Sequence, residues 1–344
     1  MRMFQILDKQ DFKPKGLLRG VESYDWRLDF QGAGGCAFAG SGTSAAENFD
    51  YILDVGTGDM MMVLRSESAG GGYIINGTGV IGMLEWRTIF PRMSLTGQVP
   101  ELLNQIINGN MRGLPFVPAA FQSPGGQYLD TTAIGGTLLG KLHQWSTQRL
   151  DVGYRAVHDT STPGCVARVE LYPERDRTLP GDMVLLSNRL GTMSLLDTVD
   201  DISEYRTKAF VAGEGEGDER VFSVTPDPPP GTPLIELYMD ARNTSRPENQ
   251  SLADYQAALI ADGIDRLSEL QRETRYTLEV TNDPFGLMVG DKVRLHLQLP
   301  GGRDITGAAR ISSIKYSGGG IAGELKEVTV GTQIWGYVPA RRQL

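Results

Sequence analysis

The chain has 344 residues and a formal net charge of −9, with 40% hydrophobic and 22% charged residues. This length suits about two or three domains, and the composition is that of a folded protein rather than a disordered one. The acidic balance excludes a general attraction to nucleic acid phosphates or anionic lipids. No segment approaches the ~20 apolar residues of a membrane span, and the first residues lack the apolar run of a signal peptide. We therefore expect a soluble protein that does not insert into a membrane.

The 43 glycines and 18 prolines indicate a chain that turns often, which favours a β-rich architecture of many short segments. The two cysteines, Cys36 and Cys165, are too few for a disulfide framework or a four-ligand zinc site. The three histidines lie far apart in the sequence and form no HxxxH or HxH pair. We therefore predict no metal site and no cofactor.

Residues 1–90 read as strands joined by glycine loops, for example "YDWRLDFQ", "DYILDVG" and "GYIINGTG". The pattern changes near Pro91. The segments "VPELLNQIINGNM" and "GTLLGKLHQWSTQRL" each place apolar residues on one helical face, and two alternating strands, "VGYRAVHD" and "CVARVELYP", follow them. Residues 91–180 are therefore predicted to form a small inserted α/β domain.

Strands resume at "DMVLLS", and a long helix begins at Ser251, where Asp254 completes a capping box. The apolar face of this helix contains Tyr255, Leu259, Gly263, Leu267 and Leu270. The last seventy residues are β again and weakly echo the first ninety, because Gly58–Asp59 and Gly290–Asp291 each lead into a strand. Such an echo fits two similar small barrels, one at each end of the chain.

The stretch "KAFVAGEGEGDERVF" has a glycine at every second position. In a strand, this period places a bare stripe on one face and a row of carboxylates on the other. The alternative is that the glycines only form a hairpin turn. A calcium loop is excluded, because its sixth and twelfth positions require glycine and glutamate and hold Glu219 and Thr225 here. The strand interpretation makes three residues candidates for close packing and three candidates for facing open space: Gly213, Gly215 and Gly217, and Glu214, Glu216 and Asp218.

Two near-matches to catalytic motifs fail on their chemistry. "GGTLLGKL" has the spacing of a phosphate-binding loop, but Leu142 stands where that loop needs a hydroxyl to hold magnesium. "SSIK" has a serine and a lysine three apart, as in some serine acylases, but it lies in a predicted strand rather than at a helix start. The sequence therefore predicts no catalytic residue and no cofactor-binding residue.

Several segments together resemble one protein family. "SEYRTKAFVAGEGEGDERVF" resembles a hallmark of the baseplate hub proteins, or minor tail proteins, of long-tailed bacteriophages. "GYIINGTGVIGMLEWRTIF", "YPERDRT", "LIELYMDAR" and "DPFGLMVGDKVRL" match further parts of that family in the right order. Each motif is moderately specific, and the ordered set, which spans about residues 1–336, is much more specific than any one of them.

The resemblance implies a mainly β fold with an α+β insert: two tail-tube-like β-barrel domains, with an α/β domain inserted in the first. Residues 1–90 and 181–246 would form the first barrel domain, 91–180 the insert, 247–336 a helix plus the second barrel domain, and 337–344 a C-terminal tail. Three copies would form a ring of six barrels that adapts a sixfold tail tube to a threefold tip.

The resemblance also implies a structural role in the virion, at the tail tip or baseplate, for a protein made in the host cytoplasm. The expected partners are two further copies of the chain, a distal tail protein ring or the tail tube, the tape-measure protein, and a tip or central fibre protein. Genomic DNA would pass through the ring without specific binding, because an acidic lumen gives the phosphates no deep trap. Glu214, Glu216 and Asp218 are candidates for the lumen, and the alternative places them on the outer wall.

The main alternative is an enzyme, such as a tail-associated protein that degrades the cell wall, whose active site forms only in the fold. Two carboxylates at glycosidase spacing in a cleft would favour it. A soluble β-rich binding module of the cell is a third class, for which the sequence offers no specific feature.

Overall fold

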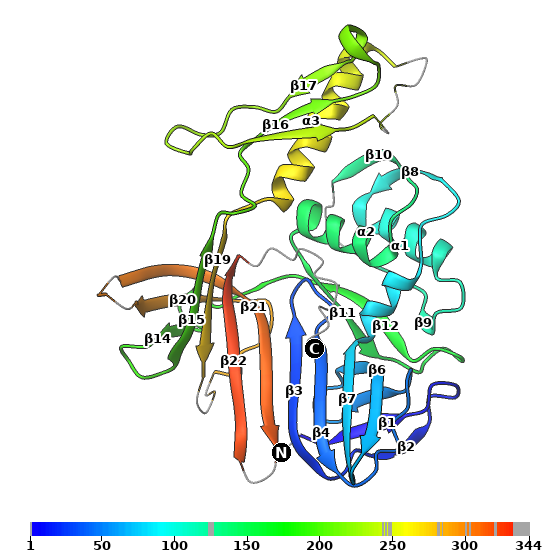
Figure 1. The fold of residues 1–344 in the computed structure, drawn as a ribbon, viewed down its shortest axis with the longest axis vertical. Helices are drawn as coiled ribbons and strands as arrows, with labels where there is room; N and C mark the ends of the chain where they lie inside the picture. The colour runs from blue at the N-terminus through cyan, green and yellow to red at the C-terminus, as the bar shows by residue number, and fades with distance from the viewer. Residues whose placement is uncertain are drawn as a thin grey trace. The chain divides into compact units, whose positions relative to one another are not determined.

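The computed structural model describes residues 2–122, 127–242, 244, 246, 250–280, 283, 285–299, 301–302, 304–319 and 322–332. The described part is mainly β (Figure 1). It contains three α-helices. None of these helices is long and apolar enough to cross a membrane. By its internal packing the chain divides into two units, Met1–Asp197 with Tyr276–Gly331, and Thr198–Arg275 with Thr332–Leu344.

The largest element is a sheet to which fourteen of the described strands contribute. Its main path runs in the order β15-β19-β22-β21-β3-β4-β7-β6-β5-β1-β2, and β20 joins β21, β13 and β14 at one side. From β22 to β2 every strand pair along the main path is antiparallel, whereas β13 and β14 pair in parallel with β20. The bounds are β1 (Phe4–Leu7), β2 (Pro14–Leu17), β3 (Val21–Asp29), β4 (Gly35–Ser41), β5 (Tyr51–Asp54), β6 (Met60–Ala69), β7 (Gly72–Gly79), β13 (Arg175–Asp176), β14 (Leu185–Ser187), β15 (Ser194–Asp201), β19 (Glu273–Glu279), β20 (Asp291–Gln298), β21 (Asp304–Gly319) and β22 (Ala322–Thr332).

Strand β21 joins two halves of this sheet. Its first part, 304–310, pairs with β20, and its second part, 313–318, pairs with β3. A shift in register between Ile311 and Ser313 marks a bulge at this change of partner. Each half has its own core: Trp26, Phe38 and Ile75 belong to one, and Leu278, Val293 and Val330 to the other.

The sheet has two open ends. The main path begins at β15 and ends at β2, and it does not close into a barrel within the described residues. The prediction of a mainly β fold is confirmed. The two predicted barrels are not closed in the described structure. The sheet instead has two halves with separate cores, and one long strand, β21, continues the hydrogen bonding from one half to the other.

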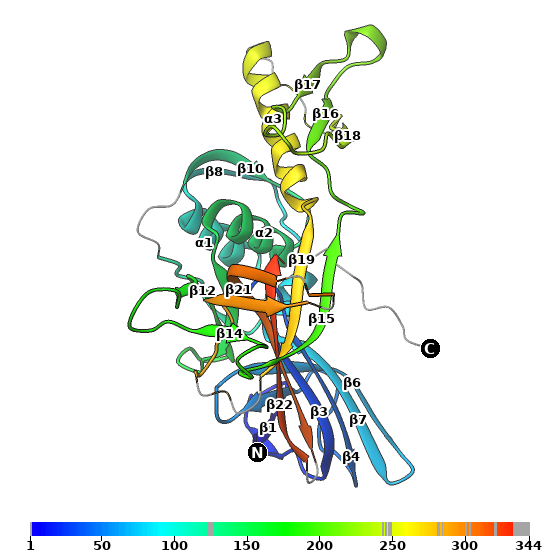
Figure 2. The ribbon, with the colours of Figure 1, turned by 90° about the vertical axis from the view of Figure 1, so that its left-hand side faces the viewer.

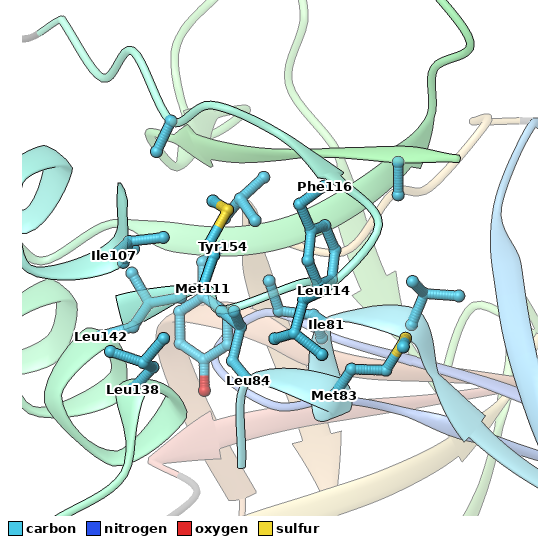
Figure 3. Packing of buried hydrophobic residues seen from close by; sticks show 14 of the residues in the cluster. Ile81, Met83, Leu84, Ile107, Met111, Leu114, Phe116, Leu138, Leu142 and Tyr154 are labelled. Atoms are coloured by element: carbon cyan, nitrogen blue, oxygen red, sulfur yellow. The ribbon is translucent and has the colours of Figure 1, made fainter. Parts of the chain in front are cut away.

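The segment between β7 and β13 packs on the first half through a shared core. It contains η1 (Val80–Trp86, a 3₁₀ helix), α1 (Val99–Asn110), α2 (Leu138–Trp145) and η2 (Ser146–Leu150, a π helix). Its strands are β8 (Met93–Gln98) with β10 (Tyr128–Ala133), and β9 (Phe116–Val117) with β11 (Gly153–His158) and β12 (Ala167–Tyr172). Figure 3 shows side chains of η1, α1, α2 and β11 in contact within this core.

The second unit contains a helix packed on a small sheet, visible in Figure 2. The sheet has the order β17-β16-β18 and is built from β16 (Lys208–Ala212), β17 (Phe222–Val224) and β18 (Glu236–Asp240). The helix is α3 (Leu252–Glu269), and a short 3₁₀ helix, η3 (Gly217–Glu219), lies between β16 and β17.

The three predicted helices are confirmed. Helix α3 begins after Ser251, whose Oγ accepts a hydrogen bond from the N–H of Asp254 at 3.1 Å, as in a capping box. Three residues of the predicted apolar face are buried, Tyr255, Leu259 and Gly263. The other two are only half-buried: Leu267 near the end of the helix, and Leu270 at its C-cap. The domain limits predicted at 90/91, 180/181 and 246/247 stay predictions, and the predicted tail at 337–344 lies outside the described residues.

Candidate functional site

The small sheet of the second unit presents different residues on its two faces. Alternate side chains of β16, Ala209 and Val211, are buried beneath α3 together with Tyr255 and Leu259. Gly263 allows the close approach, since a Cβ there would lie 2.8 Å from methyl groups of Thr225 and Val211. One face of the sheet is therefore fixed against the helix.

Gly213 continues this close packing just after β16 ends. A Cβ at Gly213 would lie 2.5 Å from the Tyr255 hydroxyl and 2.7 Å from Leu259 Cδ1. The Tyr255 hydroxyl accepts a hydrogen bond from the N–H of Glu214 at 2.7 Å and donates one to the carbonyl of Thr244 at 2.6 Å. Gly213 thus lies directly against Tyr255 and Leu259 of α3.

The prediction of a strand through Gly217 is wrong, because β16 ends at Ala212. The next residues form the hairpin turn that was the alternative prediction. Two hydrogen bonds close this turn, one from the N–H of Gly213 to the carbonyl of Val221 and one from the N–H of Val221 to the carbonyl of Glu214. Gly215 and Gly217 have φ values of +105° and +55°, which are outside the strand region and favour glycine. Gly217 has no atom within 4 Å of a Cβ position, so it is not a close-packing residue.

The acidic residues of the stretch lie on this turn. Glu214 and Glu216 are exposed, and Asp218 belongs to η3. The Glu214 carboxylate accepts a hydrogen bond from the N–H of Arg246 at 2.8 Å. Whether the three carboxylates line a channel depends on an assembly of several copies, so this role stays a prediction.

The other face of the small sheet carries exposed apolar side chains. Phe210 lies opposite Val224 on one neighbouring strand and Tyr238 on the other, and Phe222 lies one row further along β17. Phe222 is 51% exposed and Tyr238 61% exposed. The sequence carries only a weak signal for this face, because "FSV" alternates whereas "KAFVA" and "ELYMD" are continuously apolar at their centres.

Charged side chains at the edge of this face are paired with one another. Arg220 forms an ion pair with Asp240 and donates a hydrogen bond to the Tyr238 hydroxyl, and its guanidinium lies 5.9 Å from the ring centre of Phe222. The hydrogen bond from Arg242, with further bonds from Arg220, lowers the pKa of Asp240 to about 2. Lys208 pairs with Asp227 on the same side as Phe210. The charged side chains at the edge of this face therefore form ion pairs with one another and surround its apolar side chains.

A cavity of about 410 Å³ lies in the first unit. It brings together the two turns whose sequences echo each other: Gly58 and Gly290 have φ values of +78° and +90°, and Asp59 and Asp291 both line the cavity. Asp291 is buried and forms ion pairs with Arg175 and Arg177. Burial raises the pKa of Asp59.

Asp29, at the end of β3, also lines this cavity. Its Oδ2 accepts hydrogen bonds from Arg27 and from the N–H of Gly34, whereas its buried Oδ1 has no partner in the described structure. Burial raises the pKa of Asp29. Acidic groups with raised pKa are one feature of catalytic sites, and structural carboxylates also show it. Among the described residues, no group of three or more His, Cys, Asp or Glu could hold a metal ion.

Comparison with solved structures shows that almost all of the chain is similar in fold to tail proteins, two of them from prophages. A prophage tail protein from Listeria monocytogenes is 12% identical with a TM-score of 0.58, over 97% of this chain and 95% of that chain. A tail protein from Neisseria meningitidis is 16% identical with a TM-score of 0.58, over 97% and 98%. This chain has the fold of phage tail proteins. The 43 kDa tail protein of prophage MuSo2 from Shewanella oneidensis is 12% identical with a TM-score of 0.60, over 96% and 97%.

The tail-protein fold extends over almost all of the chain and of each relative. The sequence resemblance to phage tail proteins, which rested on five short motifs, is thereby confirmed at the level of fold. No protein-family model matches the chain, and no curated protein has a significantly similar sequence.

Proposed function

We propose that this chain is a structural protein of a phage tail, the hub of the tail tip or baseplate. The observation that carries the proposal is the shared fold over 96–97% of the chain with three proteins described as tail proteins, two of them from prophages. A fold alone does not define a function. The ordered motifs of the sequence are a second, independent support for the same role.

In this proposal three copies form a ring that joins the tail tube to the tip. The first and second halves of the large sheet act as the two tube-like domains of each copy, which gives six around the ring. The ring contacts a distal tail protein or the tube on one side, a tip or central fibre protein on the other, and the tape-measure protein inside. The chain acts in the virion without catalysis and without a cofactor.

The oligomeric state tests this proposal. Native mass spectrometry of the purified chain is expected to show a species of about three times 37.5 kDa, and an image reconstruction should show a ring with a central channel. A stable hexamer, or a chain that remains monomeric at the highest concentration at which it stays soluble, contradicts the hub.

The acidic turn has a place in this proposal as a lining of the channel. Duplex DNA must cross a hub during infection, and each phosphate held by a basic side chain adds a salt-dependent attraction that slows passage. Glu214, Glu216 and Asp218 would instead repel the phosphates. Glu214 and Glu216 are exposed on the turn. Exposure is required for a position in the lumen and for a position on the outer wall.

A cell-wall-degrading activity is the second candidate, and the cavity of the first unit is the observation that favours it. Two carboxyl groups with raised pKa, Asp29 and Asp59, line that cavity. Zymography on bacterial cell walls separates the candidates. We expect no lysis by the purified chain. Clear lysis that Asp29→Asn or Asp59→Asn abolishes would establish the enzyme and overturn the structural proposal.

A further inference from the structure

The aromatic face of the small sheet, formed by Phe210, Phe222, Val224 and Tyr238, lacks a covering layer in the described structure. Helix α3 covers the opposite face, and these side chains remain exposed or half-exposed. A two-layer module with an exposed aromatic face is unusual, because contiguous apolar surface costs free energy in water. Aromatic rings with an arginine among them are typical of protein-binding surfaces.

The charge of the surrounding chain indicates the chemistry of what covers this face. Residues 198–275 contain 16 acidic and eight basic side chains, so they carry −8 of the net charge of −9. Nucleic acid is therefore a poor ligand, despite the aromatic rings, because the phosphates would be repelled. The complementary partner is an apolar segment with basic side chains.

The sequence contains one such segment at its C-terminal end. Residues 333–344, "QIWGYVPARRQL", lie outside the described part of the chain. They carry two arginines and no acidic residue, together with Trp335, Tyr337 and Val338. We propose that this segment binds to the aromatic face of the small sheet in the same chain.

The topology places the start of this segment near the sheet. Strand β22 lies beside β19, and the N–H of Val280 donates to the carbonyl of Lys326. Strand β19 ends at Glu279, so the residues of β22 after Lys326 can pair with β19 only if the two strands are antiparallel. In that register Thr332 lies opposite Thr274, near the start of β19. Leu270 lies four residues before Thr274, and its carbonyl accepts a hydrogen bond from the N–H of Arg206. Arg206 in turn lies two residues before the start of β16.

The reach of the segment is sufficient. Trp335, Tyr337 and Val338 lie three to six residues beyond Thr332, so an extended chain carries them up to about 10–20 Å from it, and β16 is only five residues long. Trp335, Tyr337 and Val338 supply apolar surface for Phe210, Phe222 and Tyr238. Arg341 and Arg342 supply positive charge to an acidic unit. The segment would thereby remove the aromatic face from water without a second protein.

A disulfide-trapping experiment on the full-length chain tests this placement. Val338→Cys is combined with Val224→Cys on the aromatic face, or with Val55→Cys as a matched control of similar exposure in the first unit (40% and 46%). Cys165→Ser removes the half-buried native thiol in both variants, and Cys36 is buried. Under mild oxidation we expect the 224–338 pair to form about tenfold faster than the 55–338 pair, because binding raises the local concentration. Equal rates overturn the proposal.

A second comparison shows whether the aromatic side chains cause the preference. Phe222→Ser with Tyr238→Ser should reduce the 224–338 rate to that of the control pair. Phe90→Ser with Tyr128→Ser, two exposed aromatic residues elsewhere, should leave it unchanged. If the trapped product is a covalent dimer rather than a monomer with an internal bond, the segment belongs to a neighbouring copy and the placement within one chain is wrong.

Discussion

Gly213 packs against α3 at the point where β16 ends, and its missing side chain has a measurable consequence. A Cβ there would meet the hydrogen-bonded Tyr255 hydroxyl and Leu259. We expect Gly213→Ala to lower the free energy of unfolding by about 1–3 kcal/mol through overpacking. Gly307→Ala is the matched control in β21, because a Cβ at Gly307 has no atom within 4 Å. Denaturant unfolding measures both, and equal stabilities would show that the contact with α3 does not constrain position 213.

Asp29 predicts a specific dependence of stability on pH. Its pKa is raised in the folded chain by burial, whereas an unfolded aspartate titrates near 3.9. The folded state therefore binds more protons in the range above about pH 4, and wild-type stability falls as the pH rises from there through the folded pKa.

The variant Asp29→Asn has no carboxyl group to titrate at this position. Its stability relative to the wild type should therefore increase with pH over that range, by about 1.4 kcal/mol for each unit by which the folded pKa exceeds the unfolded one. Thermal melts between about pH 4 and pH 8 provide the measurement, and a constant difference for Asp29→Asn would contradict burial as the cause.

At Gly263 of α3, helix propensity and packing have opposite effects on the stability of a Gly→Ala variant. Alanine is a better helix former than glycine by about 1 kcal/mol, but a Cβ at Gly263 would lie 2.8 Å from Thr225 and Val211 on the sheet. Because both neighbours belong to the packed face, we expect packing to dominate and Gly263→Ala to destabilise the chain.

Gly109 of α1 gives the opposite result in the same kind of element. A Cβ at Gly109 would find only Met93 Cε at 3.5 Å, an ordinary contact. Gly109→Ala should therefore raise the free energy of unfolding by about 0.5–1 kcal/mol. A stabilising Gly263→Ala would show that α3 can move away from the sheet at little cost.

At the scale of the whole molecule, the position of the acidic turn can be tested by threading. The test uses the variant with Glu214→Lys, Glu216→Lys and Asp218→Lys. If the turn lines the lumen, this variant places nine new positive charges in the channel of the proposed trimer. This variant should bind linear duplex DNA with a strong salt dependence, whereas the wild-type chain should not bind it.

Covalently closed circular DNA distinguishes the two positions, since it cannot pass through a closed ring. If the turn lines the lumen, the lysine variant binds linear DNA and releases it from a free end but does not retain the circle. Equal retention of linear and circular DNA would place the turn on the outer wall. Electrophoretic mobility at two salt concentrations measures both cases.

Some features of this protein were decided by local sequence. The helices at Val99, Leu138 and Ser251 follow from apolar spacing and, for Ser251, from a capping box, because these signals depend on neighbours within one or two turns. The mainly β architecture follows from short alternating segments between glycines. The ordered motifs were sufficient to indicate the tail-protein fold, although each motif is short.

The glycine-rich stretch shows where local reasoning fails. A period of two predicts a strand, but a strand also needs φ values that Gly215 and Gly217 do not adopt, and the sequence does not state which conformation a glycine takes. The position of α3 made Gly213 a packing residue, whereas a Cβ at Gly215 would meet the backbone of Glu219 and Arg220 across the turn.

The tertiary structure alone decided three further features: the open path of the large sheet, the cavity that joins the two echoing turns, and the aromatic face beside β16. Each depends on which distant strands pair and on which face a helix covers. Those choices are made by contacts between residues far apart in the chain, such as β21 with both β3 and β20. Alternation within a strand shows that its two faces differ, but it does not show which face becomes buried, because that depends on the element that packs against it.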